Sequence, residues 1–221
     1  MRLVVFAWCP TAIVQALVQA GADVTAVVTG NGLAYEGMTE TCRAMSIPLV
    51  VCADVNAPSF VERIRGFEPD LLVVAGCSQR LREPVRRAAR LGAINVHPSL
   101  LPHYRGKEPL FWMVLHGESR AGVTVHVMTD ALDEGPILFQ GDLAVPPRAT
   151  ARSLAKLVDE AACRLVPEIV ACARTGALPR GRRPVEPGSH HPALNVGHGR
   201  VEWSQSAKQI DRHVRACTGY I

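Results

Sequence analysis

Short runs of apolar, largely β-branched residues recur along the first half of the chain, and a segment of helical pattern follows each of them. The runs have the length of strands and lie at residues 2–8, 23–29, 48–52, 70–76 and 92–97. The helical patterns lie at residues 11–21, 35–45, 57–66 and 82–91. Strands that are apolar on both faces are typical of a parallel sheet covered by helices on each side. The sequence therefore predicts an α/β fold with a doubly wound, mostly parallel, Rossmann-like sheet.

The second half of the chain continues the pattern and then changes character. It predicts a helix within 109–117, strands at 122–129 and 136–145 that could pair, and a long amphipathic helix over about 150–175. Residues 177–200 are rich in Pro, Gly and Arg and predict a loop, and residues 201–221 predict a short strand and a helix. We therefore expect a main domain over 1–176, and a loop with a C-terminal strand–helix extension over 177–221.

The composition excludes several classes of protein. With 48% hydrophobic and 20% charged residues among 221, the chain is globular rather than disordered. The net charge of +4 is too small to indicate nucleic acid, although it suits anionic small molecules. The seven cysteines are odd in number and never spaced C-x-x-C, which favours a reducing compartment without a zinc site. The chain shows no signal peptide and no apolar run of membrane-spanning length, so we expect a cytoplasmic protein.

A doubly wound fold raises the question of a nucleotide cofactor, which the first strand–helix turn answers. That turn lies within "FAWCPTAIV" (6–14) and contains no glycine. A dinucleotide needs glycines there, because its pyrophosphate must approach the backbone closely. The stretch "TGNG" (29–32) follows the second strand and matches no phosphate-binding motif. Dinucleotide binding is therefore disfavoured.

Polar side chains stand where predicted strands end. Asn95 and His97 alternate at the end of strand 92–97, and Asp133 follows strand 122–129. Ligands bind beyond the carboxyl ends of strands in open parallel sheets, so we expect the three residues to meet there. A carboxylate would orient the imidazole and keep it basic, and the Asn95 amide could polarise a carbonyl without taking up a proton. Because no nucleophilic Ser or Cys joins the set, it suggests direct acyl transfer to an incoming amine.

Each of these residues also has a structural interpretation. A histidine at a strand end is more often hydrogen-bonded for structural reasons than catalytic. Asp133 could cap a turn, Asn95 could form an Asx-turn, and Ser99 most simply caps the turn after the strand.

Three further histidines, His190, His191 and His198, could suggest a metal site. They lie in the Pro/Gly-rich loop and have no acidic partner at a fixed spacing. We interpret them as part of a solvated loop and expect no metal.

Two stretches carry a resemblance to a known family. The first is "INVHPSLLPHYRG" (94–106) and the second is "HGESRAGVTVHVMTDALDEGPIL" (116–138). In this order and spacing the chain resembles the folate-dependent formyltransferases, which include methionyl-tRNA formyltransferase, glycinamide ribonucleotide transformylase and sugar-nucleotide N-formyltransferases. The resemblance runs from the first strand to about residue 175. It implies the formyltransferase fold over 1–176, Asn95, His97 and Asp133 as the catalytic residues, and 10-formyltetrahydrofolate as the formyl donor.

The resemblance also implies where the folate lies. Its pteridine would lie against two segments whose backbone groups read its polar edge. The expected cofactor-binding residues are Cys77, Ser78, Gln79, Arg80, Leu81, Asp130, Ala131 and Leu132. Pro98 and Pro102 would stiffen the exit of the strand that carries Asn95 and His97, and so hold both side chains in the crevice.

Departures from the family's patterns bear on the amine that accepts the formyl group. Glycinamide ribonucleotide transformylases carry a Gly-rich phosphate-holding stretch after the first strand, where this chain has "AWCPTAI" (7–13). Methionyl-tRNA formyltransferases carry a basic insertion where residues 29–48 are short and acidic to neutral, and a tRNA-gripping domain beyond the position of Ile221. Both substrates are therefore disfavoured, the tRNA because too few phosphate contacts remain.

We expect instead a small primary amine, either an amino-sugar nucleotide or an amino acid-type metabolite. The expected substrate-binding residues are Ser99, Tyr104, Arg105 and Lys107. Arg105 could pair with a phosphate or carboxylate, or simply brace its loop. Phe111 and Trp112 could stack on a base or sugar, although such residues at a helix start are more often core.

Other functions and assemblies remain open. A 10-formyltetrahydrofolate hydrolase would use the same three residues with water as acceptor, and a methionyl-tRNA formyltransferase-like enzyme is a further alternative. A non-catalytic folate-binding protein would not need the three residues. We also expect a homodimer, for which the C-terminal helix offers one interface.

Overall fold

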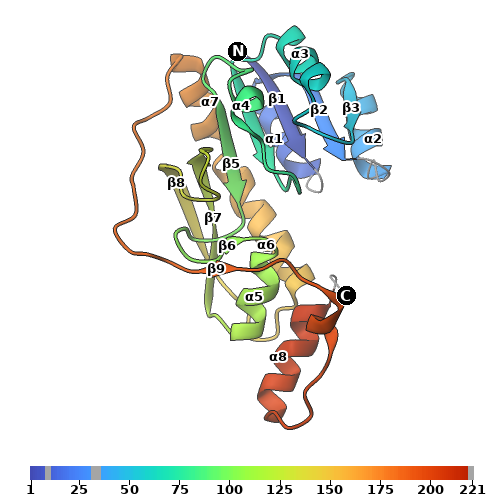
Figure 1. Cartoon of the computed structure of the whole chain (residues 1–221), viewed down its shortest axis with the longest axis vertical. Helices are drawn as coiled ribbons and strands as arrows, with labels where there is room; N and C mark the ends of the chain where they lie inside the picture. Colours follow the sequence, from blue (N-terminus) through green and yellow to red (C-terminus); the bar gives the residue numbers. More distant parts are fainter. Residues whose placement is uncertain (8–10, 31–35, 219–221) are drawn as a thin grey trace.

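A computed structural model describes residues 1–7, 11–30 and 36–218 of the chain. A seven-stranded sheet with the order β3-β2-β1-β4-β5-β7-β8 forms its centre (Figure 1). Its strands are β1 (Arg2–Ala7), β2 (Asp23–Gly30), β3 (Leu49–Cys52), β4 (Leu71–Ala75), β5 (Ala93–His97), β7 (Arg120–Val127) and β8 (Ile137–Ala144). The first five are parallel, whereas β7 runs antiparallel to β5 and β8 antiparallel to β7. The predicted α/β fold with a mostly parallel sheet is confirmed.

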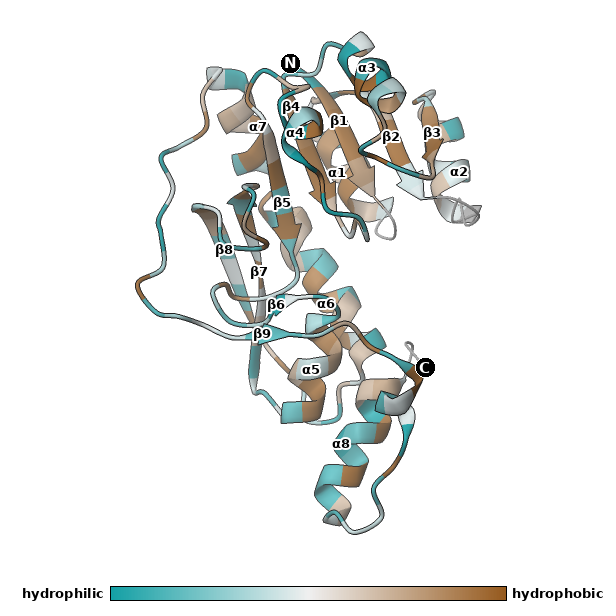
Figure 2. Ribbon diagram, viewed as in Figure 1, coloured by the Kyte–Doolittle hydropathy of each residue, from teal (hydrophilic) through white to brown (hydrophobic). Residues whose placement is uncertain are grey.

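Helices cover both faces of the sheet because the strand residues alternate between two cores. In β1, Leu3 and Val5 face one core and Val4 and Phe6 face the other, all fully buried. Burying one such side chain stabilises the fold by about 1.5–3 kcal/mol. The first core also contains residues of α1 (Thr11–Gln19), α2 (Glu36–Ala44), α5 (Pro109–His116), α6 (Ala151–Arg164), α7 (Val166–Thr175) and α8 (Ala207–Cys217). The second contains residues of α3 (Pro58–Gly66) and α4 (Glu83–Arg86), and Figure 2 shows the apolar strands between these layers.

Two predicted helices differ from the structure for reasons that lie in the backbone. The helix expected over 82–91 ends at Arg86, because the N–H groups of Arg90 and Leu91 donate to the carbonyls of Pro69 and Asp70 instead of continuing the helix. The helix expected over 150–175 is two helices, α6 and α7. Pro167 lies at the start of α7 and has no N–H to continue the hydrogen bonds of α6.

The C-terminal part also departs from expectation. No strand follows residue 200 in the described part of the chain, so the predicted short strand is wrong, whereas the predicted helix is α8. The predicted loop contains a short strand, β9 (His190–His191), and a 3-10 turn, η1 (Val196–Gly199). β9 pairs in parallel with β6 (Arg105–Gly106), which sequence reasoning missed.

We call residues 177–206 the strap. The strap leaves α7, passes along the outer side of β8 and crosses the molecule at β9 before it reaches α8 (Figure 1). It is fixed to the sheet where Arg182 and Ile137 exchange two backbone hydrogen bonds of 2.8 Å. At its far end α8 packs against α5 and α6. The extension is therefore attached to the sheet at its start and to the helices α5 and α6 at its end.

Two sequence expectations fall outside the described residues. The glycine-free turn within 6–14 includes residues 8–10, and "TGNG" includes residues beyond Gly30. In the described residues, no helix is long and apolar enough to cross a membrane.

Candidate active site

The end of β5 carries two polar side chains on the same face of the sheet. Asn95 is half-buried and His97 is buried, with 4% of its surface exposed. In the antiparallel register with β7, Asn95 lies opposite His126 and His97 opposite Thr124. Because alternate residues share a face, β5 and β7 together present four polar side chains to the same side.

Asp133 reaches this face by an unexpected route. The strand before it, β7, is antiparallel to β5, so the carboxyl ends of these strands do not meet, and that part of the prediction is wrong. Instead the loop after β7 folds back along the sheet. At Gly135 a Cβ atom would lie 1.7 Å from the carbonyl oxygen of Val127, so the close return requires glycine. Asp133 itself has a φ of 54°, and its Oδ2 accepts a 2.9 Å hydrogen bond from the N–H of Gly106.

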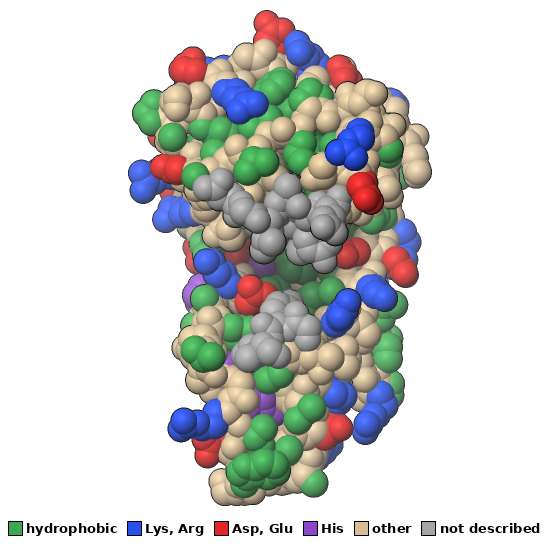
Figure 3. Space-filling view, turned by 90° about the vertical axis from the view of Figure 1, so that its right-hand side faces the viewer, with side chains coloured by type: hydrophobic (Ala, Val, Ile, Leu, Met, Phe, Trp, Pro, Cys, Tyr) green, Lys and Arg blue, Asp and Glu red, His purple; other side chains and the backbone are tan. Residues whose placement is uncertain are grey.

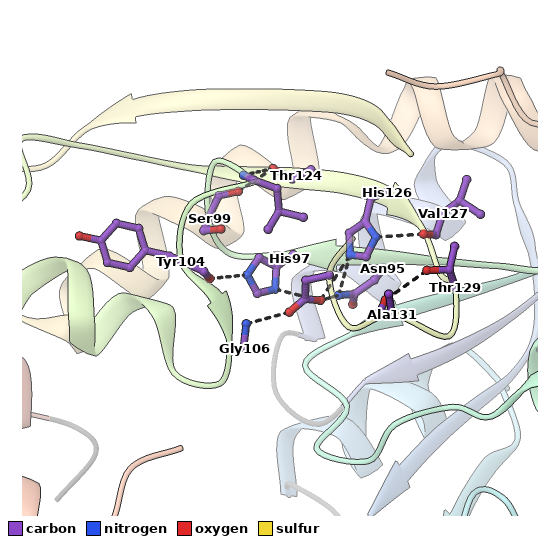
Figure 4. Close-up of polar contacts among 12 residues, drawn as sticks. Asn95, His97, Ser99, Tyr104, Gly106, Thr124, His126, Val127, Thr129 and Ala131 are labelled. Carbon is purple, nitrogen blue, oxygen red and sulfur yellow. Dashed lines mark hydrogen bonds and ion pairs between the residues drawn. The ribbon is translucent and has the colours of Figure 1, made fainter. Parts of the chain in front are cut away.

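The carboxylate of Asp133 lies close to three side chains. Its Oδ1 is 3.4 Å from Asn95 Nδ2, 3.6 Å from His126 Nε2 and 3.8 Å from His97 Nδ1. Figure 4 shows Asn95, His97 and His126 converging from the two strands. The three residues expected from the sequence thus lie together.

The hydrogen bonds of His97 define its neutral form. Nε2 lies 2.9 Å from the backbone carbonyl oxygen of Tyr104, and because a carbonyl only accepts, Nε2 carries the proton (Figure 4). Nδ1 is then free to accept a proton and faces Asp133. Burial lowers the pKa of His97, against the opposing effects of Asp133 and the Tyr104 carbonyl. His97 is therefore a neutral base at pH 7.

Asp133 is held in its charged form, whereas His97 is held in its neutral form. Burial alone would raise the pKa of its carboxyl group, but the nearby imidazoles of His126 and His97 and the N–H of Gly106 outweigh it and lower the pKa to about 2. The carboxylate is therefore ionised at every pH at which the protein is expected to work. It can stabilise a positive charge that forms on His97.

His126 is a fourth member of the site that sequence reasoning missed. Its Nδ1 donates to the carbonyl oxygen of Val127 at 3.0 Å, so Nε2 is free to accept from Asn95 Nδ2 at 3.2 Å. The Asn95 amide therefore donates to both His126 and Asp133. The signal was present in "GVTVHVMT", where Thr124 and His126 alternate with valines and so share one face of the strand.

The depressed pKa of His97 leads to a testable prediction. A base whose folded pKa lies below its ordinary value of 6.5 stays neutral to lower pH than usual. We expect the imidazole signals of His97 in an NMR titration to change below pH 6.5. The unfolded chain binds this proton first, so folding stability should begin to fall as the pH drops below 6.5. A His97 midpoint at or above 6.5 would contradict the burial described here.

The segments expected to hold the folate lie at the ends of β4 and β7. Ser78 and Arg80 are exposed, whereas Leu81 is fully buried and Cys77 donates to the carbonyl of Gln79. The Gln79 side chain donates a hydrogen bond to the carbonyl of Ala53 and accepts one from the N–H of Val55. Any contact from Gln79 and Leu81 to a ligand would therefore come from their backbones, as the resemblance implies.

Arg86 joins the two folate segments. Its buried guanidinium donates to the carbonyl of Leu81 at 2.6 Å and to the Asp130 carboxylate at 2.8 Å. The pKa of Asp130 is lowered by this contact. In the second segment Ala131 is exposed and its carbonyl accepts from Thr129, and Leu132 is 48% exposed. Arg86 thus fixes the distance between the segments.

The residues expected to bind substrate occupy four different environments. Ser99 is fully buried, and its hydroxyl donates to the carbonyl of His103 at 2.7 Å, which supports its alternative role in the turn. Tyr104 points its ring away from His97 and donates to Glu118 (Figure 4). Arg105 pairs with Glu134 and donates to the carbonyl of Pro187. Lys107 is exposed.

The aromatic residues of α5 are part of the core. Phe111 is fully buried and Trp112 is 9% exposed, so the core interpretation of these residues is supported. Among the described residues, no three His, Cys, Asp or Glu side chains lie together as a metal site. The face shown in Figure 3 is hollowed at mid-height between the two ends of the molecule, and acidic and histidine side chains line the hollow.

Comparisons with known proteins agree with this fold. Residues 1–170 match the family described as formyl transferase. Glycinamide ribonucleotide transformylase 1 from Symbiobacterium toebii is 27% identical, with a TM-score of 0.73 over 83% of this chain and 92% of that chain. A sugar N-formyltransferase from Shewanella sp is 19% identical, with a TM-score of 0.77 over 98% and 87%. The N-formyltransferase from Helicobacter canadensis, in complex with folinic acid and dTDP-3-aminofucose, is 14% identical, with a TM-score of 0.76 over 97% and 79%.

Proposed function

The chain belongs to the formyl transferase family and is a folate-dependent formyltransferase, and from that premise we propose that it transfers the formyl group of 10-formyltetrahydrofolate to a primary amine of a small molecule. The observation that carries the proposal is the approach of Asp133 to Asn95 and His97, with Oδ1 3.4 Å from the amide and 3.8 Å from the imidazole. An amide donor, a neutral base and a carboxylate are what transfer to an amine requires, without a nucleophile from the protein.

The donor supplies an activated formyl carbon bonded to nitrogen. As the amine nitrogen bonds to that carbon, negative charge grows on the formyl oxygen, where the Asn95 amide can donate a hydrogen bond. To do so, the amide exchanges its present contacts with His126 and Asp133 for the ligand. The neutral Nε2 of His126 therefore acts as the resting acceptor that holds Asn95 in place.

His97 transfers the proton from the amine to the folate nitrogen. Its Nδ1 takes the proton that the amine loses, and Asp133 stabilises the imidazolium that results. The same proton then passes to the folate nitrogen as its bond to the formyl carbon breaks. One bond to the formyl carbon forms and one breaks, and His97 returns to its neutral state.

The structure offers features that fit a folate. A Cβ atom placed on Gly76, just after β4, would have no atom of the described residues within 4 Å, which leaves room beside the first folate segment in that part of the chain. The exposed Leu132 supplies an apolar surface in the second segment. Backbone groups of residues 77–79 and 130–132 would hold the polar edge of the pteridine. These features support the cofactor-binding residues expected from the sequence.

Arg86 provides a test of this folate site. Replacing Arg86 with Met keeps an apolar stem of similar length but removes the donors to Leu81 and Asp130. We expect the Kd for tetrahydrofolate to rise by about tenfold, the effect of about 1.4 kcal/mol, because the segments lose their fixed spacing. Isothermal titration calorimetry measures this, with Arg87→Met as the control, since Arg87 is exposed and pairs with Glu83 on the same helix turn rather than with a folate segment. Equal affinities in the two variants would contradict the role of Arg86.

We infer that the acceptor is an amino-sugar nucleotide or an amino acid-type metabolite. Arg105 supports an anionic acceptor, because its buried Nε has no hydrogen-bond partner among the described residues. The similar structures include both sugar N-formyltransferases and glycinamide ribonucleotide transformylases, so the family alone does not select the amine. The glycine-free turn within 6–14 is the feature that argues against glycinamide ribonucleotide.

Release of tetrahydrofolate from 10-formyltetrahydrofolate tests the function. The purified protein is assayed alone and then with amino-sugar nucleotides, amino acids, glycinamide ribonucleotide and initiator Met-tRNA. We expect turnover that depends on one small amine. Turnover without any amine would make the protein a hydrolase, and turnover that depends on Met-tRNA would overturn the small-molecule assignment.

We keep the homodimer as a proposal for the surface around α8. Three apolar side chains on or before this helix are exposed, namely Val196, Trp203 and Val214, with Trp203 at 82%. Sedimentation equilibrium of the protein and of Trp203→Ser tests whether they form an interface.

A further inference from the structure

One residue of the strap, Ser189, makes three hydrogen bonds to the loop that follows β5. The N–H of Ser189 donates to the carbonyl of Pro102 at 3.1 Å, and its carbonyl accepts from the N–H of Arg105 at 2.9 Å. Its hydroxyl oxygen accepts from the N–H of Tyr104 at 2.9 Å. Ser189 thus satisfies three backbone groups within four residues of the loop that leads out of the active site.

Two further features fix this contact. The ring of His191 is stacked between Tyr104, with centroids 4.8 Å apart, and Trp112, with centroids 5.3 Å apart. Gly188 has a φ of 66°, and a Cβ atom there would lie 2.0 Å from the carbonyl oxygen of Pro102. The backbones of the strap and the loop therefore approach so closely at Gly188 that a side chain there would not fit.

Tyr104 connects this contact to the chemistry. It has a φ of 59°, a conformation that non-glycine residues adopt only when their surroundings hold them there. Its carbonyl accepts the Nε2–H of His97 at 2.9 Å and so leaves Nδ1 as the basic nitrogen. This carbonyl belongs to the Tyr104–Arg105 peptide, whose N–H donates to the Ser189 carbonyl, while the Ser189 hydroxyl accepts from the N–H of the preceding peptide. The backbone on both sides of Tyr104 therefore determines which nitrogen of His97 carries the proton.

We propose that Ser189 is a positioning residue for catalysis, which acts through Tyr104 to hold His97 with its proton on Nε2. The strap lies beyond residues 1–170, the part that matches the formyl transferase family. The inference rests on the proposed function, because the Nδ1 base has a role only if His97 takes a proton from the acceptor.

Three variants test the proposal. Ser189→Ala removes the acceptor for the Tyr104 N–H, Ser189→Thr restores a hydroxyl, and Ser204→Ala removes an exposed strap hydroxyl for which the structure shows no contact with the loop. We expect Ser189→Ala to lower kcat by about tenfold, the effect of one hydrogen bond felt fully in the transition state, with KM for the folate unchanged. Ser189→Thr should recover most of the loss, and Ser204→Ala should match the natural protein.

A second readout needs no turnover. The ¹⁵N chemical shifts of His97 report which nitrogen carries the proton, and His97→Ala identifies its signals. We expect protonation at Nε2 in the natural protein and a larger share of the Nδ1-protonated form in Ser189→Ala. If Ser189→Ala does not fold, Ser189→Cys replaces it, since a thiol of similar shape is a much weaker acceptor.

The outcomes separate the two claims. An unchanged His97 tautomer and kcat in Ser189→Ala would overturn the positioning role. So would equal losses in Ser189→Ala and Ser189→Thr that follow their unfolding midpoints in urea, because that pattern belongs to a merely structural contact. If no amine supports turnover but the tautomer still shifts in Ser189→Ala, the proposed function fails while the positioning contact stands.

Discussion

His97→Ala is expected to lower kcat by about a thousandfold or more, with little change in the Kd for tetrahydrofolate. A positioned general base contributes typically 10²–10⁴-fold, and Nδ1 of His97 is the unprotonated ring nitrogen that faces Asp133. The loss of the imidazole removes this proton acceptor without removing the backbone groups of the folate segments. Steady-state kinetics with the accepted amine and calorimetry with tetrahydrofolate measure the two effects.

His103→Ala is the matched control for this variant. His103 lies six residues further along the same loop, its side chain is exposed, and its ion-pair partner is Glu186 on the strap. We expect it to keep the kcat of the natural protein. If His97→Ala kept comparable activity, proton transfer by His97 would be excluded and the mechanism would have to be rebuilt around His126.

Asp133→Asn is the second large effect, and we expect kcat to fall by a factor on the order of 10² to 10³. Asparagine keeps the shape and can still accept from Gly106, but it has no charge to stabilise the imidazolium on His97. Without the carboxylate the pKa of His97 should fall further, since Asp133 is the largest influence that raises it. Activity and an NMR titration of His97 in the variant measure both consequences.

Asp133→Asn should also reduce the loss of folding stability at acid pH. The pKa of Asp133 falls to about 2 from 3.8, so the natural protein gains stability from the ionised form at neutral pH and loses it as the pH falls from about 4 to about 2. The gain is about 2 kcal/mol. Urea unfolding at pH 6 and pH 3 should show a smaller acid loss in Asp133→Asn. Asp23→Asn, at an exposed position, serves as control. An Asp133→Asn variant with unchanged kcat would contradict the charge-stabilising role.

Much of the fold followed from local patterns. The alternation of β-branched runs and helical segments predicts the strands and the sheet, because each strand residue must be buried on one face or the other. The pattern does not report strand direction, and β7 and β8 are antiparallel. Helix ends were missed where the decisive contact is distant in sequence, as at Arg90 and Leu91, whose N–H groups bond to residues 69 and 70.

In the site, too, some residues could be predicted from local patterns and others depend on contacts that are distant in sequence. Asn95, His97 and Asp133 could be found as polar residues that follow predicted strands, and the resemblance implied their catalytic role. The return of the loop that carries Asp133 depends on Gly135 passing close to Val127, a tertiary contact that no local pattern reveals. His126 and Ser189 were missed for related reasons, since one is a polar residue within an apolar strand and the other lies 85 positions from its partner Tyr104.

Asn95, His97 and Asp133 are proposed to promote direct transfer of the formyl group to an amine. Rapid-quench kinetics with a ¹³C-formyl donor and the accepted amine test it most directly, combined with the intact mass of the enzyme at each time. We expect formyl amide and tetrahydrofolate to appear in equal amounts with one rate constant, and an unmodified enzyme mass throughout. A formyl group bound to the protein, or formate in place of the amide, would contradict direct transfer to an amine.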